Sequence, residues 1–174
     1  MVVYFIPFNK KEHLDDFYEM NIEYMTWVLD ELDRYAQIDS RKIIGATIPE
    51  LVDNTIGPFL NLKLEEGILL IASFDGKVAG MGAIKKLNES TGEIKRMYTR
   101  PDYRGRGIGK KMLQKLLETG REYGYTEFML DTPKWASAAQ HIYKSAGFKE
   151  IEEYPESEIP PEIKSYWMFM KRKT

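Results

Sequence analysis

The sequence contains no cysteine and only two histidines, His13 and His141. Without cysteine the chain can form no disulfide bond and no cysteine-ligated zinc site, and it has no cysteine nucleophile. Two histidines are also too few for a histidine metal cluster. We therefore expect no bound metal.

The chain also lacks a basic excess and a long apolar run. The net charge is -2 and the pI is about 5.8, which argues against general nucleic-acid binding. No apolar run approaches the length of a membrane span. The N-terminal residues MVVYFIPFNKKEH have neither a basic region before the apolar residues nor an A-x-A site, so we expect no signal peptide. These absences predict a cytoplasmic protein with no nucleic-acid or membrane partner.

What the chain does have is an ordinary globular composition. It has 174 residues, of which 43% are hydrophobic and 30% are charged. That length suffices to bury a substantial core and corresponds to one domain. We expect a single domain over residues 1–174.

One stretch, EIKRMYTRPDYRGRGIGK at residues 93–110, combines a strand, a glycine-rich turn and the start of a helix. Three glycines at every second position leave the backbone N–H groups unshielded, and the helix adds unpaired N–H groups and the positive end of its dipole. Such an arrangement binds phosphate groups. The predicted phosphate-binding residues are Arg104, Gly105, Arg106, Gly107, Ile108, Gly109 and Lys110.

This stretch matches neither of two common phosphate-binding motifs. A P-loop requires G-x-x-x-x-G-K-[ST], but Arg104 occupies the first glycine position and Lys111 replaces the Ser or Thr that binds magnesium. A dinucleotide fingerprint requires G-x-G-x-x-G, whereas the spacing here is G-x-G-x-G. The pattern that fits is R-x-x-G-x-G at residues 104–109.

Helices are predicted from apolar periodicity and from residues that begin or end a helix. An apolar stripe predicts a long first helix after Asn9, with an acidic opposite face. Thr47 and Glu50 form a capping-box pattern for a second helix, which we expect to end at Gly57–Pro58. Two later amphipathic helices are expected to end at Gly124 and Gly147.

Strands are predicted between these helices from apolar and alternating runs. Asp75–Gly76 is a strong hairpin signal and joins two antiparallel strands. The predicted strands cover residues 2–6, 68–74, 78–87, 93–99, 127–131, 148–154 and 165–170. The resulting order, β-α-α-β-β-β-α-β-α-β-β, predicts an α/β (α+β) fold with a mixed sheet flanked by helices.

A second pattern, A-x-x-x-Y-x-x-x-G-F at residues 139–148, follows the first by some forty residues. Together the two resemble the signatures of the GNAT superfamily, the acyl-CoA-dependent N-acyltransferases. The resemblance covers about half of the chain strongly. It implies a mixed, mostly antiparallel central sheet, acetyl-CoA as co-substrate, no metal, and a pyrophosphate bound by the N–H groups of residues 104–110.

The resemblance also implies which residues contact the pantetheine arm of acetyl-CoA. The backbone of Met97 and Thr99, with Tyr98 between them, would bind this arm and polarise the thioester carbonyl. Many members place an asparagine seven residues before the motif tyrosine. This chain has Ala136 there, and we expect Ser137 to substitute.

Two residues are candidates for catalysis. An ammonium ion cannot attack a thioester, so the acceptor must lose a proton. Glu93 lies where some members place a catalytic glutamate, and we expect it to share a strand face with Lys95 and Met97. The alternatives are a bound water as base and Glu93 as an exposed turn residue. Tyr143 fits the family's general acid, and its alternative is a core tyrosine.

Two other side chains were considered for the site. His141 lies two residues from Tyr143 and therefore points elsewhere on the helix, so we expect it at the surface. Trp135 is either a packing residue or a wall of the substrate site.

The predicted function is transfer of an acetyl group from acetyl-CoA to a primary amine of a small molecule or peptide. A non-catalytic acyl-CoA-binding protein of the same fold is the alternative, and a nucleotide-binding protein of another fold is a more remote one. The acidic face of the first helix favours a cationic acceptor. The last strand is apolar on both faces, which predicts a helix over one face and a partner chain over the other in a homodimer.

Overall fold

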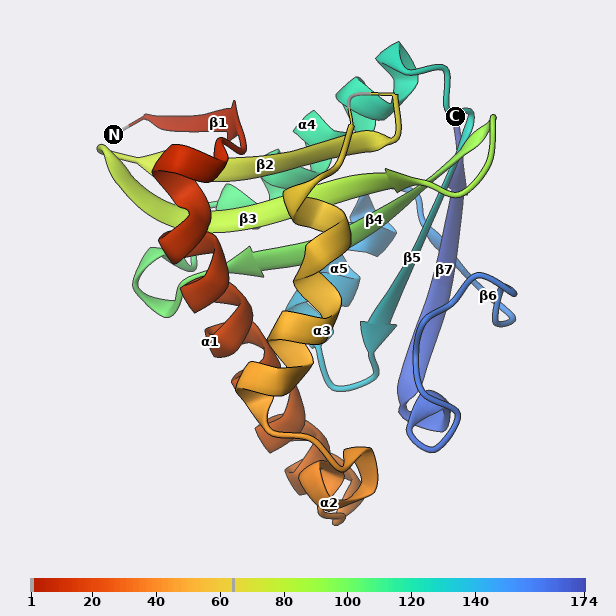
Figure 1. The fold of residues 1–174 in the computed structure, drawn as a ribbon. Helices are drawn as coiled ribbons and strands as arrows, with labels where there is room; N and C mark the ends of the chain where they lie inside the picture. Colours follow the sequence, from red (N-terminus) through yellow and green to blue (C-terminus); the bar gives the residue numbers. More distant parts are fainter. Residues whose placement is uncertain (1, 64) are drawn as a thin grey trace.

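A computed structural model describes residues 2–63 and 65–174 of the chain. Its centre is a seven-stranded sheet in the order β1-β2-β3-β4-β5-β7-β6 (Figure 1). All neighbouring strands are antiparallel except β4 and β5, which are parallel. The strands are β1 (Val3–Pro7), β2 (Gly67–Phe74), β3 (Lys77–Lys86), β4 (Thr91–Thr99), β5 (Glu127–Pro133), β6 (Lys149–Ile151) and β7 (Trp167–Lys173). The predicted mixed, mostly antiparallel sheet is confirmed.

Helices cover both faces of this sheet (Figure 1). They are α1 (Lys10–Ala36), α2 (Ser40–Ile44), α3 (Ile48–Leu60), α4 (Ile108–Glu122) and α5 (Ser137–Ser145). Phe17 of α1 and Ile56 of α3 pack with Leu69 and Ile71 of β2 on one face. The α4 side chains pack with Leu70 and Ala72 of the same strand on the other face. A strand whose central residues 68–72 are all apolar is therefore buried on both sides.

Two of the predicted helix starts are confirmed in detail. The Asn9 side chain accepts a hydrogen bond from the Lys11 N–H over 2.9 Å at the start of α1. Thr47 and Glu50 form the complete capping box of α3, in which each side chain bonds the other residue's backbone N–H. These local signals fix the first turn of each helix.

The predicted end of α3 at Gly57–Pro58 is wrong, because the helix continues to Leu60 with Pro58 inside it. Proline removes one helical hydrogen bond. Burial of Phe59, which is 5% exposed in the core, offsets that loss. The Asn61 side chain also donates to the Gly57 carbonyl over 3.3 Å. Tertiary packing thus overrides a local stop signal.

The C-terminal strands also differ from the prediction. The strand expected over residues 148–154 is only Lys149–Ile151, so Tyr154 lies beyond it in a loop. The last strand begins at Trp167, after a short 3-10 turn, and extends to Lys173.

The chain's own residues cover both faces of β7. Trp167 and Phe169 pack with Val28 and Leu32 of α1, while Met170 packs in the core on the α4 side. The two apolar faces of β7 therefore do not argue for a partner chain. The homodimer stays a prediction. In the described part of the chain, no helix is long and apolar enough to cross a membrane.

Candidate functional site

The parallel strands β4 and β5 pair over a short distance and then separate. Their register joins Thr91 to Glu127, Gly92 to Phe128 and Glu93 to Met129, and no further pair follows among the described residues. Beyond this point β4 stays with β3, while β5 pairs with β7 along its whole length. Figure 1 shows the two strands diverging in front of α5. Among the described residues, the β4 backbone after Glu93 consequently has no strand partner on the β5 side. We refer to the region between the two diverging strands as the cleft.

A β-bulge in β4 changes which side chains enter this cleft. Between the pairs Met81–Tyr98 and Ala83–Lys95, β3 has one residue and β4 has two. Arg96 takes up the extra length with a φ of 55°. The predicted face shared by Glu93, Lys95 and Met97 is therefore wrong. Met97 packs toward α4, on the opposite side from the Glu93 carboxylate.

The glycine-rich loop has the predicted geometry at the end of β4. Gly105 and Gly107 have φ values of 74° and 76°, which favour glycine, and Gly107 is the N-cap of α4. Lys111 donates to the Gly107 carbonyl over 3.1 Å. The preceding first-turn N–H groups, on Ile108, Gly109 and Lys110, have no partner within the helix by geometry. A helix end with free N–H groups of this kind is suited to binding an anion.

The arginines of this loop fix it to the surrounding strands. Arg104 donates from Nε to the Thr99 carbonyl over 3.0 Å, and its guanidinium lies 5.7 Å from the ring centroid of Tyr98. Burial and a hydrogen bond to Glu23 raise the pKa of Tyr98 to about 12. Arg106 lies over the ring of Phe74 at 5.2 Å. Arg104 thus shapes the turn, and the Tyr98 side chain packs toward α1. The expected contact of the Tyr98 backbone with the pantetheine arm stays a prediction.

Tyr143 lies on α5, behind the diverging strands. It is 6% exposed, and its ring packs edge-on against Phe148 with centroids 6.0 Å apart. Burial raises the pKa of Tyr143, and the electrostatic influence of Tyr24 and Asp131 raises it further. The phenol therefore remains protonated at neutral pH, as a general acid must. Because Tyr24 lies on α1, across the sheet, this influence reaches Tyr143 from the opposite face.

Glu93 is buried in the sheet, so its alternative as an exposed turn residue is wrong. It is 1% exposed, and its Oε1 accepts a hydrogen bond from the Tyr154 hydroxyl over 2.6 Å. The Lys95 ammonium lies 3.3 Å from the same oxygen. Burial raises the pKa of Glu93, while Lys95 and Tyr154 oppose that rise. A carboxylate with a raised pKa is better matched to proton abstraction near neutral pH.

Further charged groups surround Glu93. Burial raises the pKa of Asp131 on β5, and Lys95 opposes the rise. Burial alone would lower the pKa of Lys95, but Asp131 and Glu93 raise it overall. Lys95 also binds Glu158 of the loop before β7 over 2.8 Å. We call Glu93, Lys95, Asp131, Tyr154 and Glu158 the cleft cluster.

Three members of the cleft cluster were not identified from the sequence. Asp131 could have been found, because a carboxylate directly after the apolar run FML is unusual inside a buried strand. Tyr154 and Glu158 give no such signal. They lie in a loop and reach β4 across more than sixty residues of sequence.

The residues at the start of α5 have distinct positions. Ala136 is buried at the N-cap, while Ser137 is exposed and begins the helix. The expected contact of Ser137 with the pantetheine arm stays a prediction. Trp135 packs edge-on against Trp167 with centroids 5.2 Å apart, which favours its packing role. His141 is exposed, as predicted.

The acidic face of α1 is largely neutralised by arginines. Arg100, at the end of β4, binds Asp16, Glu19 and Glu23 together. Arg41 binds two further α1 carboxylates over 2.6 and 3.2 Å. A face paired in this way attracts a cation less than its sequence suggests. The described residues contain no group of three or more acidic or histidine side chains placed to hold a metal.

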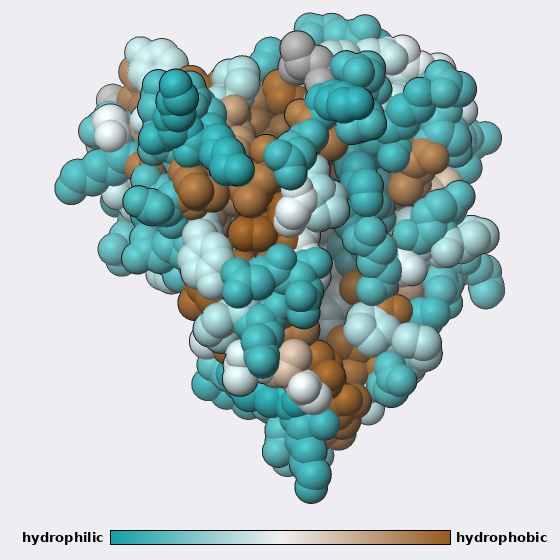
Figure 2. All heavy atoms as spheres, in the orientation of Figure 1, coloured by the Kyte–Doolittle hydropathy of each residue, from teal (hydrophilic) through white to brown (hydrophobic). Residues whose placement is uncertain are grey.

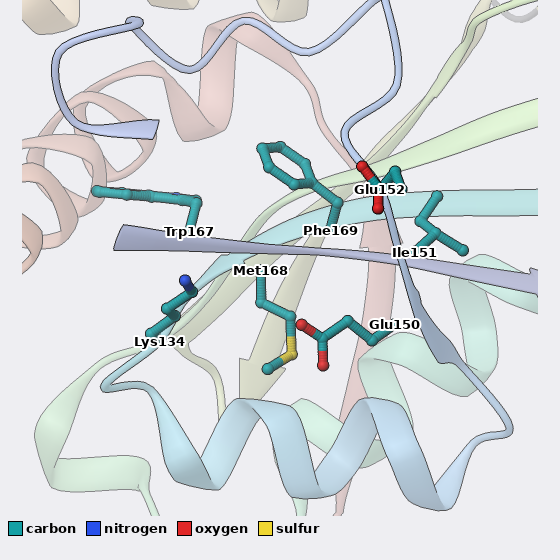
Figure 3. Close-up of a pocket in the computed structure, with 7 residues that line it drawn as sticks. All are labelled: Lys134, Glu150, Ile151, Glu152, Trp167, Met168 and Phe169. Carbon is teal, nitrogen blue, oxygen red and sulfur yellow. The ribbon is translucent and has the colours of Figure 1, made fainter. Parts of the chain in front are cut away.

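Two surface cavities flank this region. One of about 630 Å³ lies between α1 and the end of β4, and Trp27, Tyr98 and Arg104 line it. The other, of about 510 Å³, lies beside β6 and β7, and Lys134, Glu150 and Trp167 are among its lining residues (Figure 3). None of the predicted site residues lines the second cavity. On the face that carries α1 and α3, Figure 2 also shows a recess between α3 and the C-terminal strands.

Comparison with known proteins places this geometry in a family. The profile of the acetyltransferase (GNAT) family matches residues 14–148. An uncharacterised N-acetyltransferase of Schizosaccharomyces pombe is 30% identical over 66% of this chain and 71% of its own length. The IAA acetyltransferase of Azospirillum brasilense is 29% identical over 71% of this chain and 75% of its own. The PaiA N-acetyltransferase of Thermoplasma acidophilum, solved in complex with coenzyme A, has the same fold, with a TM-score of 0.71, 22% identity and full coverage of both chains.

Proposed function

This chain belongs to the acetyltransferase (GNAT) family, and from that premise we propose that it transfers an acetyl group from acetyl-CoA to a primary amine. The acceptor is a small molecule or a peptide, and it attacks the thioester directly. One observation carries the proposal. After Glu93, β4 has no strand partner on the β5 side among the described residues, and this part of β4 leads to the N-terminus of α4, while the buried Tyr143 lies on α5 behind the diverging strands.

The residues around the cleft fit acetyl-CoA. The first turn of α4 supplies N–H groups for the pyrophosphate, and the open space around Gly105 and Gly107 leaves the loop backbone accessible. The backbone of Met97 and Thr99 faces the cleft and would bind the pantetheine arm. Ser137 would add a hydroxyl at the entrance to the cleft.

The cleft also has groups for both proton transfers. Glu93, directly or through a bound water, accepts a proton from the acceptor ammonium. The neutral nitrogen then attacks the thioester carbonyl and forms a carbon–nitrogen bond. As the carbon–sulfur bond breaks, Tyr143 donates its proton to the departing thiolate. The acylated nitrogen loses its second proton, which restores the Tyr143 hydroxyl through water, and Glu93 releases the first proton to solvent. The products are an N-acetylated amine and CoA.

A screen of amines for CoA thiol release tests this function against the alternative of a non-catalytic acyl-CoA-binding protein. We expect acetyl-CoA to bind and at least one amine to release thiol faster than water alone does. Mass spectrometry should show one acetyl group added to that amine. Tight binding of acetyl-CoA with no thiol release from any small amine or peptide N-terminus would favour the binding protein instead.

A further inference from the structure

Three cationic residues of the adjacent strands β3 and β4 belong to the cleft cluster or lie next to it in the sheet. Lys85 lies on β3 opposite Glu93, and Lys95 and Arg96 lie on β4. Glu158, from the loop before β7, lies beside the two lysines, and its charge also raises the pKa of Arg96 against the lowering effect of burial. Its carboxylate is 3.3 Å from the Lys85 ammonium and 2.8 Å from that of Lys95.

Arg96 is poorly satisfied in this arrangement. Its Nη1 atom is buried with no hydrogen-bond partner, and its Nη2 atom has only a 3.3 Å bond to the Thr55 carbonyl. The guanidinium otherwise lies over the ring of Phe59 at 5.2 Å. The described part of the chain gives it no ion pair, although a largely buried charge is costly without one. Arg96 also has a strained, positive φ, and such residues concentrate at functional sites.

Glu158 has the character of a replaceable partner. Its side chain is 60% exposed, and it belongs to a loop rather than to the sheet. The cations around it are far less exposed, since the Lys95 side chain is only 12% exposed. The cations therefore belong to the sheet, whereas the exposed carboxylate that pairs with Lys85 and Lys95 comes from a surface loop.

We propose that the acceptor amine carries a carboxylate, which takes the place of the Glu158 carboxylate between Lys85 and Lys95 and draws in the unsatisfied guanidinium of Arg96. This inference rests on the proposed acetyl transfer and specifies its acceptor. The Lys95 ammonium is 3.3 Å from the Glu93 carboxylate. An acceptor carboxylate bound by Lys95 would therefore lie next to Glu93, the proposed base. The amine must consequently lie close to the carboxylate in the acceptor. These features describe an amino acid and not a polyamine.

The test compares amino acids with their decarboxylated amines, such as lysine with cadaverine, by thiol release. The wild-type protein should use the amino acid with a kcat/KM at least about 10-fold higher, as expected for a charge-assisted contact. Glu158→Gln removes the competing charge and should lower KM for the amino acid but not for the amine. Arg96→Met should lower kcat/KM for the amino acid about 10- to 100-fold. Arg41→Gln, an arginine on α2, is the matched control.

Stability separates this role from a structural one. Because Arg96 is a poorly paired charge, Arg96→Met should leave the Tm unchanged or raise it. A Tm that falls together with the loss of activity would assign Arg96 a structural role and overturn the proposal. Equal or better use of the decarboxylated amines would also overturn it, while leaving acetyl transfer intact. A third outcome is that the protein prefers succinyl-CoA to acetyl-CoA and that Arg96→Met loses this preference. The cations would then bind the carboxylate of the acyl donor, and the proposed acceptor carboxylate would be rejected.

Calorimetry decides the proposal even if no acceptor in the panel is turned over. Amino acids are then titrated into the CoA-saturated protein. Binding that weakens in Arg96→Met and tightens in Glu158→Gln would support the carboxylate site, although the proposed transfer would have failed. Absence of binding, or binding that neither substitution changes, would reject it.

Discussion

The Tyr154 hydroxyl donates a 2.6 Å hydrogen bond to Glu93, and this bond joins a C-terminal loop to the buried start of β4. It stabilises the ionised form of Glu93, whose pKa is raised by burial. The Tyr154 ring also packs edge-on against Phe169, with centroids 5.8 Å apart. Tyr154 therefore supports the proposed base both electrostatically and by packing.

Tyr154→Phe separates these two contributions. The ring remains, but Glu93 loses the hydrogen bond that lowers its pKa, so that pKa rises further. Since a base acts only when deprotonated, the acidic limb of the kcat/KM profile should move to higher pH. The measurement is the pH dependence of thiol release at saturating acetyl-CoA. An unchanged acidic limb would mean that the titrating base is not Glu93.

Gly109 offers a cleaner test of CoA binding than Gly107. A side chain at Gly107 would strain a backbone with a φ of 76°. Gly109 lies within α4, and an added Cβ would meet only Ile142 at 3.5 Å and Thr99 at 3.9 Å. Gly109→Ala should thus stabilise the protein by up to about 1 kcal/mol through helix propensity. It should nevertheless weaken acetyl-CoA binding, because its methyl group would lie in the helix turn whose N–H groups are proposed to bind the pyrophosphate.

Gly124→Ala is the matched control for Gly109→Ala. Gly124 has a φ of 89° and open space around it, at the far end of α4. Alanine there should cost about 1–2 kcal/mol of stability and leave acetyl-CoA affinity unchanged. Calorimetry and thermal unfolding of both variants give the comparison. Full CoA affinity in Gly109→Ala would contradict the assigned phosphate site.

Arg100 should stabilise the contact between α1 and the end of β4. Its side chain is 18% exposed and binds three carboxylates of α1, namely those of Asp16, Glu19 and Glu23. Arg100→Gln leaves these three carboxylates together without their cation. We therefore expect the free energy of unfolding to fall by about 1 kcal/mol or more at low salt. The loss should shrink at high salt, which screens the remaining repulsion.

Arg34→Gln provides the reference for that measurement. Arg34 pairs with Glu31 within one helix turn, and its side chain is 73% exposed. Urea unfolding should show a change of less than about 0.5 kcal/mol for this variant. Equal effects of the two substitutions would show that Arg100 makes no special contribution to the position of α1.

The features predicted from the sequence are those that neighbouring residues determine. The glycine-rich loop, the capping box of α3 and the position of Tyr143 follow from short motifs. The end of α3 was not predictable, because the burial of Phe59 outweighs a proline. Local patterns therefore predicted the glycine-rich turn and the helix that follows it, where phosphate binding stays a prediction.

The rest of the site depends on contacts between distant segments. The bulge at Arg96 has no glycine to mark it, so strict alternation placed Met97 on the wrong face. Tyr154 and Glu158 reach β4 only because β7 returns beside β5 and brings their loop over the cleft. No spacing rule connects residues that fold together in this way.

The central claim is that Tyr143 protonates the departing thiolate in the cleft between β4 and β5. Tyr143→Phe keeps the ring against Phe148 and removes only the hydroxyl. Acetyl-CoA affinity and Tm should therefore change little, since the hydroxyl acts mainly in the transition state. The decisive measurement is kcat for thiol release with an acceptor from the amine screen. We predict a fall of about 10²-fold, whereas full turnover by Tyr143→Phe would contradict the assignment and leave Tyr143 as a packing residue.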